Sequence, residues 1–147
     1  MKKVRCCETM AYWYDQLWNQ RNPEPIETVL ADDFVLHGHG GEKITKQGYR
    51  AFFDAICQGF REIHLEVVDQ IEEGDRCAMR LALTATLNST GKKAEFQMQA
   101  FIRFDDEGRA VEAWDTVDWY GYLTRVDALP ADTLNLVIEE GKTFTAL

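Results

Sequence analysis

The sequence predicts an α+β protein in which helices from the first half of the chain pack on a curved antiparallel sheet and enclose a pocket. Two observations predict this fold. Apolar residues recur at a spacing of three and four in the first half, and they alternate with polar residues in the second half. Helices followed by strands are typical of α+β folds rather than of parallel sheets. Because helices cannot fill a strongly curved sheet completely, we expect a small-molecule pocket between them.

Three helices are expected. The first covers residues 7–22 and ends before Pro23, because the residue before a proline avoids helical angles. Its apolar face consists of Met10, Trp13, Tyr14, Leu17 and Trp18. Pro25 suits the first turn of a second, short helix over residues 25–30. A third helix is expected over residues 48–58, with a glycine directly after it.

The strands are separated by turn-forming residues. A short strand over residues 34–37 precedes a glycine-rich loop over residues 38–41. Four longer strands with short turns between them then predict an antiparallel meander. They cover residues 63–67, 77–83, 94–104 and 109–118.

The composition is that of a globular protein. The chain has 147 residues, of which 46% are hydrophobic and 28% are charged. No linker or repeat divides it, so we expect one domain over residues 1–147, with residues 131–147 as a C-terminal extension. The formal net charge is −9 without any cluster of Lys or Arg. Nucleic-acid binding depends largely on basic side chains, so we expect no nucleic-acid partner.

The cysteines and the N-terminus predict a cytoplasmic protein. Cys6, Cys7, Cys57 and Cys77 lack the spacing of metal ligands, and a chain of this size does not need a disulfide framework. We therefore expect reduced thiols. No apolar run approaches the roughly 20 residues of a membrane-spanning helix, and residues 1–9 lack the apolar stretch of a signal peptide.

Asp115 is the strongest candidate for chemistry. In the last strand it shares a face with three apolar residues, which are Val111, Ala113 and Val117. A buried carboxyl has a raised pKa, which suits general acid–base catalysis near neutral pH. The alternative is a structural Asp115 that pairs with Arg80 or Arg103, or that lies at a sheet edge.

Gln99 and Asp118 are further polar candidates. Gln99 shares one face of its strand with Gln97, Phe101 and Arg103, and it would reach a bound ligand if that face meets the face of Asp115. Asp118 either contacts the ligand or caps the helix that begins at Trp119. The aromatic candidates for the core and the pocket lining are Trp13, Tyr14, Trp18, Phe53 and Phe101.

His37 and His39 place two imidazoles at strand spacing, which is half of what a metal site requires. No third ligand stands at a recognisable spacing, so we expect no metal. His37 either faces the ligand or is held by structural hydrogen bonds. The sequence contains no glycine-rich phosphate loop and no nucleophile motif, so we expect no cofactor.

Four stretches of the chain carry a family resemblance. They are residues 31–38 (ADDFVLHG), 73–80 (EGDRCAMR), 101–118 (FIRFDDEGRAVEAWDTVD) and 120–130. They resemble the SnoaL-like proteins of the NTF2-like superfamily, which includes polyketide cyclases and relatives of ketosteroid isomerase and limonene epoxide hydrolase. The resemblance implies a cone of helices on a curved sheet around one pocket. It specifies the fold better than the reaction, because this superfamily hosts many chemistries and many non-enzymes.

The resemblance also implies site residues. Asp115 matches the general acid/base of the family's polyketide cyclases by its Trp-Asp context, and Gln99 matches a glutamine on the facing strand. Ala113 and Phe101 stand where those cyclases carry histidines. This difference counts against an aromatic polyketide as the substrate.

We therefore expect a cofactor-free cyclase, isomerase or hydrolase that acts on a small, mostly apolar substrate bearing a carbonyl or similar group. Asp115 would move a proton and Gln99 would bind the developing oxyanion. The alternatives are a protein that binds a ligand without chemistry, and a structural protein. In the family's manner, a homodimer is expected through the outer sheet face, which carries Arg80, Thr84, Trp114 and Thr116.

Overall fold

The computed structural model describes residues 5–39 and 41–145, so residues 1–4, on which the signal-peptide argument partly rests, lie outside it, as does Gly40 of the expected loop. Within this part of the chain, six strands form one curved sheet in the order β2-β1-β6-β5-β4-β3. The strands are β1 (Leu30–His39), β2 (Glu42–Thr45), β3 (Phe60–Glu73), β4 (Arg76–Leu87), β5 (Lys93–Phe104) and β6 (Ala110–Val117). The helices are α1 (Cys6–Trp13), the π-helix η1 (Tyr14–Asn19), α2 (Pro25–Val29), α3 (Lys46–Gly59), α4 (Trp119–Arg125) and α5 (Thr133–Ile138).

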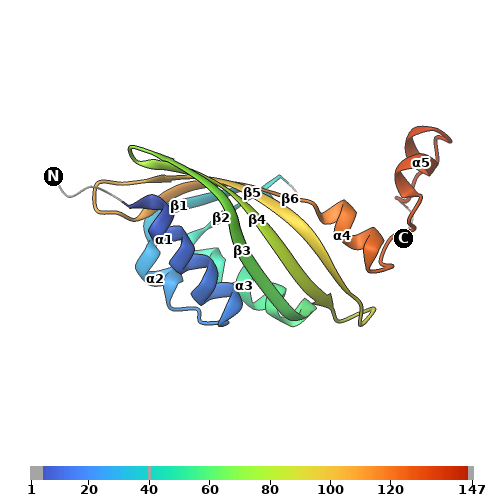
Figure 1. The fold of residues 1–147 in the computed structure, drawn as a ribbon, viewed down its shortest axis with the longest axis horizontal. Coiled ribbons are helices and arrows are strands. Elements are labelled where there is room, and N and C mark those ends of the chain that lie inside the picture. The colour runs from blue at the N-terminus through green and yellow to red at the C-terminus, as the bar shows by residue number, and fades with distance from the viewer. Residues whose placement is uncertain (1–4, 40, 146–147) are drawn as a thin grey trace.

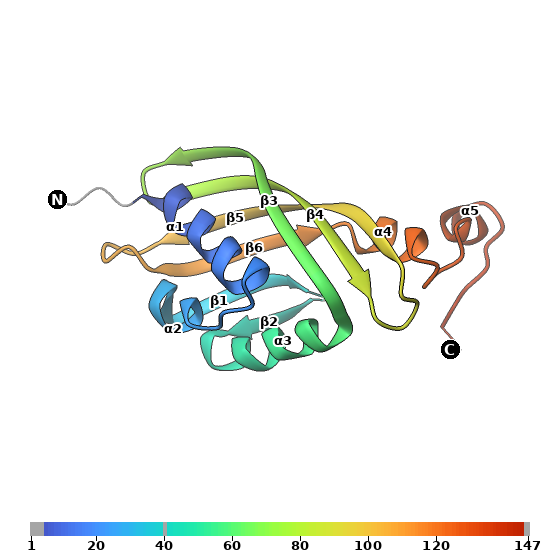
Figure 2. The ribbon, with the colours of Figure 1, turned by 60° about the horizontal axis from the view of Figure 1, so that its bottom comes forward.

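Helices α1, α2 and α3 lie against one face of the sheet, as Figures 1 and 2 show. The predicted α+β fold is confirmed. The antiparallel meander is also confirmed, because β3, β4, β5 and β6 pair in sequence order. No helix in the described residues is long and apolar enough to cross a membrane.

Strand β2 and both pairings of β1 were not predicted. Strand β1 lies parallel to β6, with Leu36 opposite Ala113 and His37 opposite Trp114. The expected loop from Gly38 was placed too early, since β1 continues to His39, which pairs with Glu42 of β2. Both partners of β1 supply backbone hydrogen bonds, and these outweigh the weak strand propensity of glycine.

The first predicted helix is α-helical only as far as Trp13. The chain continues as the π-helix η1 from Tyr14 and this helix ends at Asn19. The Asn19 side chain then hydrogen-bonds to the backbone of β3. The Asn19 Nδ2 atom donates to the Leu65 carbonyl at 3.0 Å, and the Leu65 amide donates to Asn19 Oδ1 at 2.7 Å. π-helical segments occur frequently at functional sites. Here the segment fixes Tyr14 and Trp18 against the sheet.

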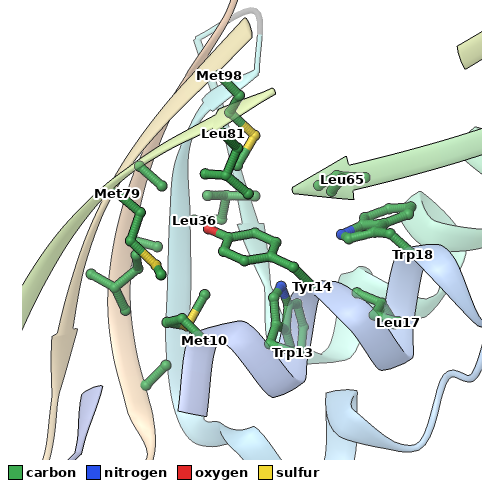
Figure 3. Packing of buried hydrophobic residues seen from close by; sticks show 14 of the residues in the cluster. Met10, Trp13, Tyr14, Leu17, Trp18, Leu36, Leu65, Met79, Leu81 and Met98 are labelled. Atoms are coloured by element: carbon green, nitrogen blue, oxygen red, sulfur yellow. The ribbon is translucent and has the colours of Figure 1, made fainter. Parts of the chain in front are cut away.

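The core lies between these helices and the concave face of the sheet (Figure 3). Strand β5 shows how the alternation works. Its inward residues are buried, while those between them are exposed or half-buried. The inward set is Phe96, Met98, Ala100, Ile102 and Phe104.

Helix α4 still packs on the core, where Tyr122 is fully buried, and the chain leaves the core only after Val126. Asp118 caps the start of helix α4, and its Oδ1 accepts from the Gly121 amide at 2.9 Å. Helix α5 projects beyond α4 (Figure 1), and Leu134 and Ile138 on it are exposed.

Candidate functional site

A cavity of about 80 Å³ lies between the helices and the inner face of the sheet. Eight aromatic side chains surround it, namely Trp13, Tyr14, Trp18, Tyr49, Phe52, Phe60, Phe96 and Trp119. The remaining apolar lining is Met10, Leu36, Ile56, Ile63, Leu65, Leu83, Ala85, Met98, Ile102, Ala113 and Val117. Asp115 is the only lining residue in the described chain that carries a formal charge at neutral pH. A cavity of this kind suits a mostly apolar ligand with few polar atoms.

Asp115 faces this cavity from β6, opposite Ala100 of β5. Its side chain keeps a partly accessible surface, because it borders open cavity space rather than packed atoms. Burial raises the pKa of this carboxyl from 3.8 to about 7. The carboxyl thus exchanges a proton readily at neutral pH.

The alternative of a structural Asp115, paired with Arg80 or Arg103 or held at a sheet edge, is wrong, because β6 lies inside the sheet between β1 and β5. Its carboxylate makes no hydrogen bond or ion pair with any residue that the structure describes. Arg80 pairs with Asp69 at 3.1 Å instead, and Arg103 pairs with Glu112 at 3.3 Å. Both arginines extend from the outer face of the sheet, whereas Asp115 lies on the inner face, so the sheet itself separates them.

Two tyrosines accompany Asp115. Tyr14 and Tyr49 line the same cavity, from η1 and α3. Burial raises the pKa of both phenols well above the usual value, and the charge of Asp115 raises it further. Tyr49 was not among the candidate site residues from the sequence. Its place beside a residue 66 positions later in the chain has no signal in the sequence alone.

The prediction that Gln99 faces Asp115 is wrong. Gln99 is exposed on the outer face of the sheet, where it lies opposite Thr116 and Arg80. A one-residue offset along a strand moves a side chain to the other face, and Ala100 therefore occupies the inner position. The sequence did contain the signal, because the alternate residues of β5 form a wholly apolar set and Gln99 lies outside it.

Phe101 also lies outside the cavity. It is 40% exposed on the outer face, and its ring contacts Trp114 edge-on at 5.8 Å. Its assignment to the pocket lining fails for the same reason as that of Gln99.

His37 is held by structural contacts on the outer face. Its ring stacks on Trp114 at 5.3 Å, and its Nε2 atom lies 2.9 Å from Glu112 Oε2. Hydrogen bonds from His37 and Arg103 lower the pKa of Glu112. The expectation of a ligand-facing His37 is therefore wrong. The His39 side chain lies outside what the structure describes, and no three potential ligands among the described residues gather as a metal site.

The remaining candidates divide between the cavity and the surrounding structure. Trp13, Tyr14 and Trp18 line the cavity and pack in the core. Phe53 is buried against Trp18, with ring centroids 5.4 Å apart, but it stands behind the cavity wall. Asp118 caps α4 and is likewise absent from the lining, which supports its capping role.

The comparisons with known proteins agree with this fold. A family model described as SnoaL-like polyketide cyclase matches residues 8–125. The structure of AclR from Streptomyces galilaeus, a candidate hydroxylase, is similar at 25% identity and a TM-score of 0.70, covering 85% of this chain and 99% of that chain. IdmH from Streptomyces antibioticus, a candidate polyketide cyclase, is similar at 24% identity and a TM-score of 0.75, covering 84% and 99%.

A third solved structure extends the likeness in fold. A protein from Catenulispora acidiphila with a ketosteroid isomerase-like fold has 18% identity and a TM-score of 0.74, with coverage of 85% of this chain and 95% of that chain. Among curated proteins, none matches the chain.

Proposed function

Because the chain belongs to the SnoaL-like polyketide cyclase family, we propose that it is a cofactor-free enzyme in which Asp115 transfers a proton on a small, mostly apolar substrate that bears a carbonyl or similar group. One observation carries this proposal. The Asp115 carboxyl has no hydrogen-bonding or ionic partner among the described residues, and it borders an apolar cavity. Its pKa is about 7. A group with this pKa serves as base and as acid in turn at neutral pH.

The reaction class is a cyclisation, an isomerisation or a hydrolysis. All three need a proton moved to or from carbon or oxygen, and none needs a redox cofactor. The match to the SnoaL-like polyketide cyclase family supports small-molecule chemistry on this fold. Ala113 borders the cavity where the resemblance places a histidine in polyketide cyclases, which favours a substrate other than an aromatic polyketide.

The test uses 5-nitrobenzisoxazole, a small apolar compound that opens to a coloured phenolate when a base removes its one acidic proton. Asp115→Asn removes the base with little change in shape. We expect catalysed opening in the wild type to follow an apparent pKa near 7 and to fall about 100-fold or more in the variant. Asp69→Asn, on the outer face, is the matched control and should keep the wild-type rate. Equal rates in the wild type and Asp115→Asn would show that Asp115 is not the base.

A second candidate function is ligand binding without chemistry. The observation that favours it is the lack, in the described lining, of a second carboxyl or an imidazole beside Asp115. Tight binding of a natural ligand, without product after long incubation, would support it.

The outer face of the sheet is the proposed dimer interface. It exposes large apolar side chains, with Ile71 73% exposed and Trp114 41% exposed. Arg80 and Thr116 border the same shallow surface. Such a patch on a folded protein marks an interaction site, and a second copy presents the same patch to it. A cytoplasmic location is likewise proposed, from the free thiols.

A further inference from the structure

Two hydroxyl groups in the cavity have no role in holding the fold. Tyr14 and Tyr49 are each only 4% exposed. Neither hydroxyl hydrogen-bonds to any residue in the described ranges. Buried polar groups nearly always have a partner, and no fully buried side-chain nitrogen or oxygen in the described chain lacks one. Both hydroxyls therefore border open cavity space.

A third buried tyrosine shows the contrast. Tyr122 is fully buried, and its hydroxyl donates to the Ala85 carbonyl at 3.1 Å. It does not line the cavity. The Tyr122 hydroxyl, which is buried in packed structure, thus has a hydrogen-bond acceptor. The hydroxyls of Tyr14 and Tyr49, which border the cavity, are available to a ligand.

The two hydroxyls are held in place beside the acid. The Tyr49 ring contacts Trp13 edge-on, with centroids 5.2 Å apart, and Phe52 at 5.5 Å. Tyr14 extends from η1 toward the sheet, as Figure 3 shows. Both lie close enough to Asp115 for its charge to raise the pKa of their phenols, which therefore stay protonated as hydrogen-bond donors at neutral pH.

We propose that the Tyr14 and Tyr49 hydroxyls donate hydrogen bonds to the carbonyl oxygen of the substrate and so orient it toward Asp115. This inference rests on the proposed function, and it narrows the substrate class to uncharged, mostly apolar carbonyl compounds. No lining residue in the described chain carries a positive charge that would hold a carboxylate or a phosphate. Burying such an anion without a cation is costly.

Asp115 and the two tyrosine hydroxyls can carry out the proton transfer without any further group. The Asp115 carboxylate removes a proton from the carbon next to the carbonyl, and the C–H electron pair forms a C=C bond. The carbonyl π electrons move to the oxygen, where the two phenol donors stabilise the negative charge. In a substrate with a C=C bond between its β and γ carbons, the protonated Asp115 then returns the proton to the γ carbon, which gives the conjugated isomer. In a substrate with a second carbonyl, it returns the proton to the oxygen formed when the enolate carbon attacks that carbonyl.

Two probes of similar size test the donors. 2-Acetylnaphthalene carries a carbonyl, and 2-ethylnaphthalene carries a methylene group in its place. Trp13, Trp18 and Trp119 line the cavity, so quenching of their fluorescence reports binding of either probe. Tyr14→Phe and Tyr49→Phe should each weaken ketone binding about 3- to 10-fold, the range of one hydrogen bond. Binding of the hydrocarbon should stay unchanged, which also shows that the cavity is intact.

A second readout and a control separate binding from structure. Each Tyr→Phe substitution should move the infrared C=O stretch of the bound ketone to higher frequency, because a donor is lost. Tyr122→Phe removes a hydroxyl that only supports the fold. It should lower the melting temperature and leave the ratio of ketone to hydrocarbon affinity at the wild-type value.

The outcomes distinguish this inference from the proposed function. An unchanged affinity ratio and an unchanged C=O stretch in both cavity variants would overturn the inference, and another donor such as an indole N–H would then hold the carbonyl. If Asp115→Asn abolishes base catalysis in that case, the proposed function still stands. If both tyrosines change the ratio while Asp115→Asn leaves base catalysis unchanged, the donors are confirmed and the proposed function fails.

Discussion

Gly38 lies directly against the backbone of Asp115. A Cβ atom placed on Gly38 would stand 2.0 Å from the Asp115 carbonyl oxygen. Its φ of 122° is also one that L side chains rarely adopt. This contact occurs where β1 and β6 run parallel, immediately after the pair His37 and Trp114. The glycine therefore lets the two strands approach at the position of the proposed acid.

Gly38→Ala should destabilise the protein by about 2 kcal/mol or more, because it combines backbone strain with a collision against main-chain atoms. Urea denaturation measures the change. Gly59→Ala is the control, since a Cβ at the end of α3 meets nothing within 4 Å. It should match or slightly exceed the stability of the wild type. Equal stabilities for the two variants would contradict the close approach.

Asp115 should make stability depend on pH. Its folded-state pKa of about 7 lies above the value of 3.8 for a free carboxyl, so the folded protein binds the proton more tightly than the unfolded chain. Stability is therefore lost as the pH rises from about 4 to about 7, by at most about 4 kcal/mol. Asp115→Asn should gain stability relative to the wild type across this window. The comparison uses urea denaturation at several pH values.

Two regions of the pH range serve as internal controls for that comparison. The difference between wild type and Asp115→Asn should be constant below about pH 4 and above about pH 8, where Asp115 has the same protonation in both states. A difference that stays level from pH 4 to pH 8 would mean that the carboxyl titrates normally.

The dimer prediction depends on Trp114. This side chain is 41% exposed, and it lies between His37 and Phe101 on the outer face of the sheet. Trp114→Ser should weaken self-association by about tenfold or more, as the loss of a central aromatic anchor does. Sedimentation equilibrium at micromolar concentration measures it. Tyr12→Ser, at a similarly exposed aromatic on α1, should leave association unchanged. A wild-type protein that sediments as a monomer would contradict the predicted dimer.

The four cysteines are free thiols in the structure. Burial raises the pKa of all four, and that of Cys6 reaches about 11, so few thiolates are present at pH 8. Cys57 is half-buried, and the other three are buried. A thiol reagent should therefore react first with Cys57 in the native protein, and with all four thiols in urea. Cys57→Ser should abolish the fast phase. Rapid reaction of two or more native thiols would disagree with this packing.

Several features could be predicted from the sequence because neighbouring residues specify them. The helical spacing around Trp13 and Trp18 and the alternation along β5 each arise within one segment. Short turns, such as the one at Gly74, require consecutive strands to pair as a meander. The apolar neighbours of Asp115 on its own strand predicted its inward orientation, and the structure places it in the cavity lining.

Only the tertiary structure decided which groups join Asp115. Tyr14 and Tyr49 come from two helices that reach the cavity by packing on the same sheet, and Gly38 comes from a parallel strand far earlier in the chain. Gln99 does not lie in the site, because the helices cover the opposite face of β5, which carries Ala100. A segment's own periodicity divides its side chains into two faces, but long-range packing selects the face that meets the cavity. The sequence therefore determined most of the elements and the inward face of Asp115, and the fold determined which groups surround it.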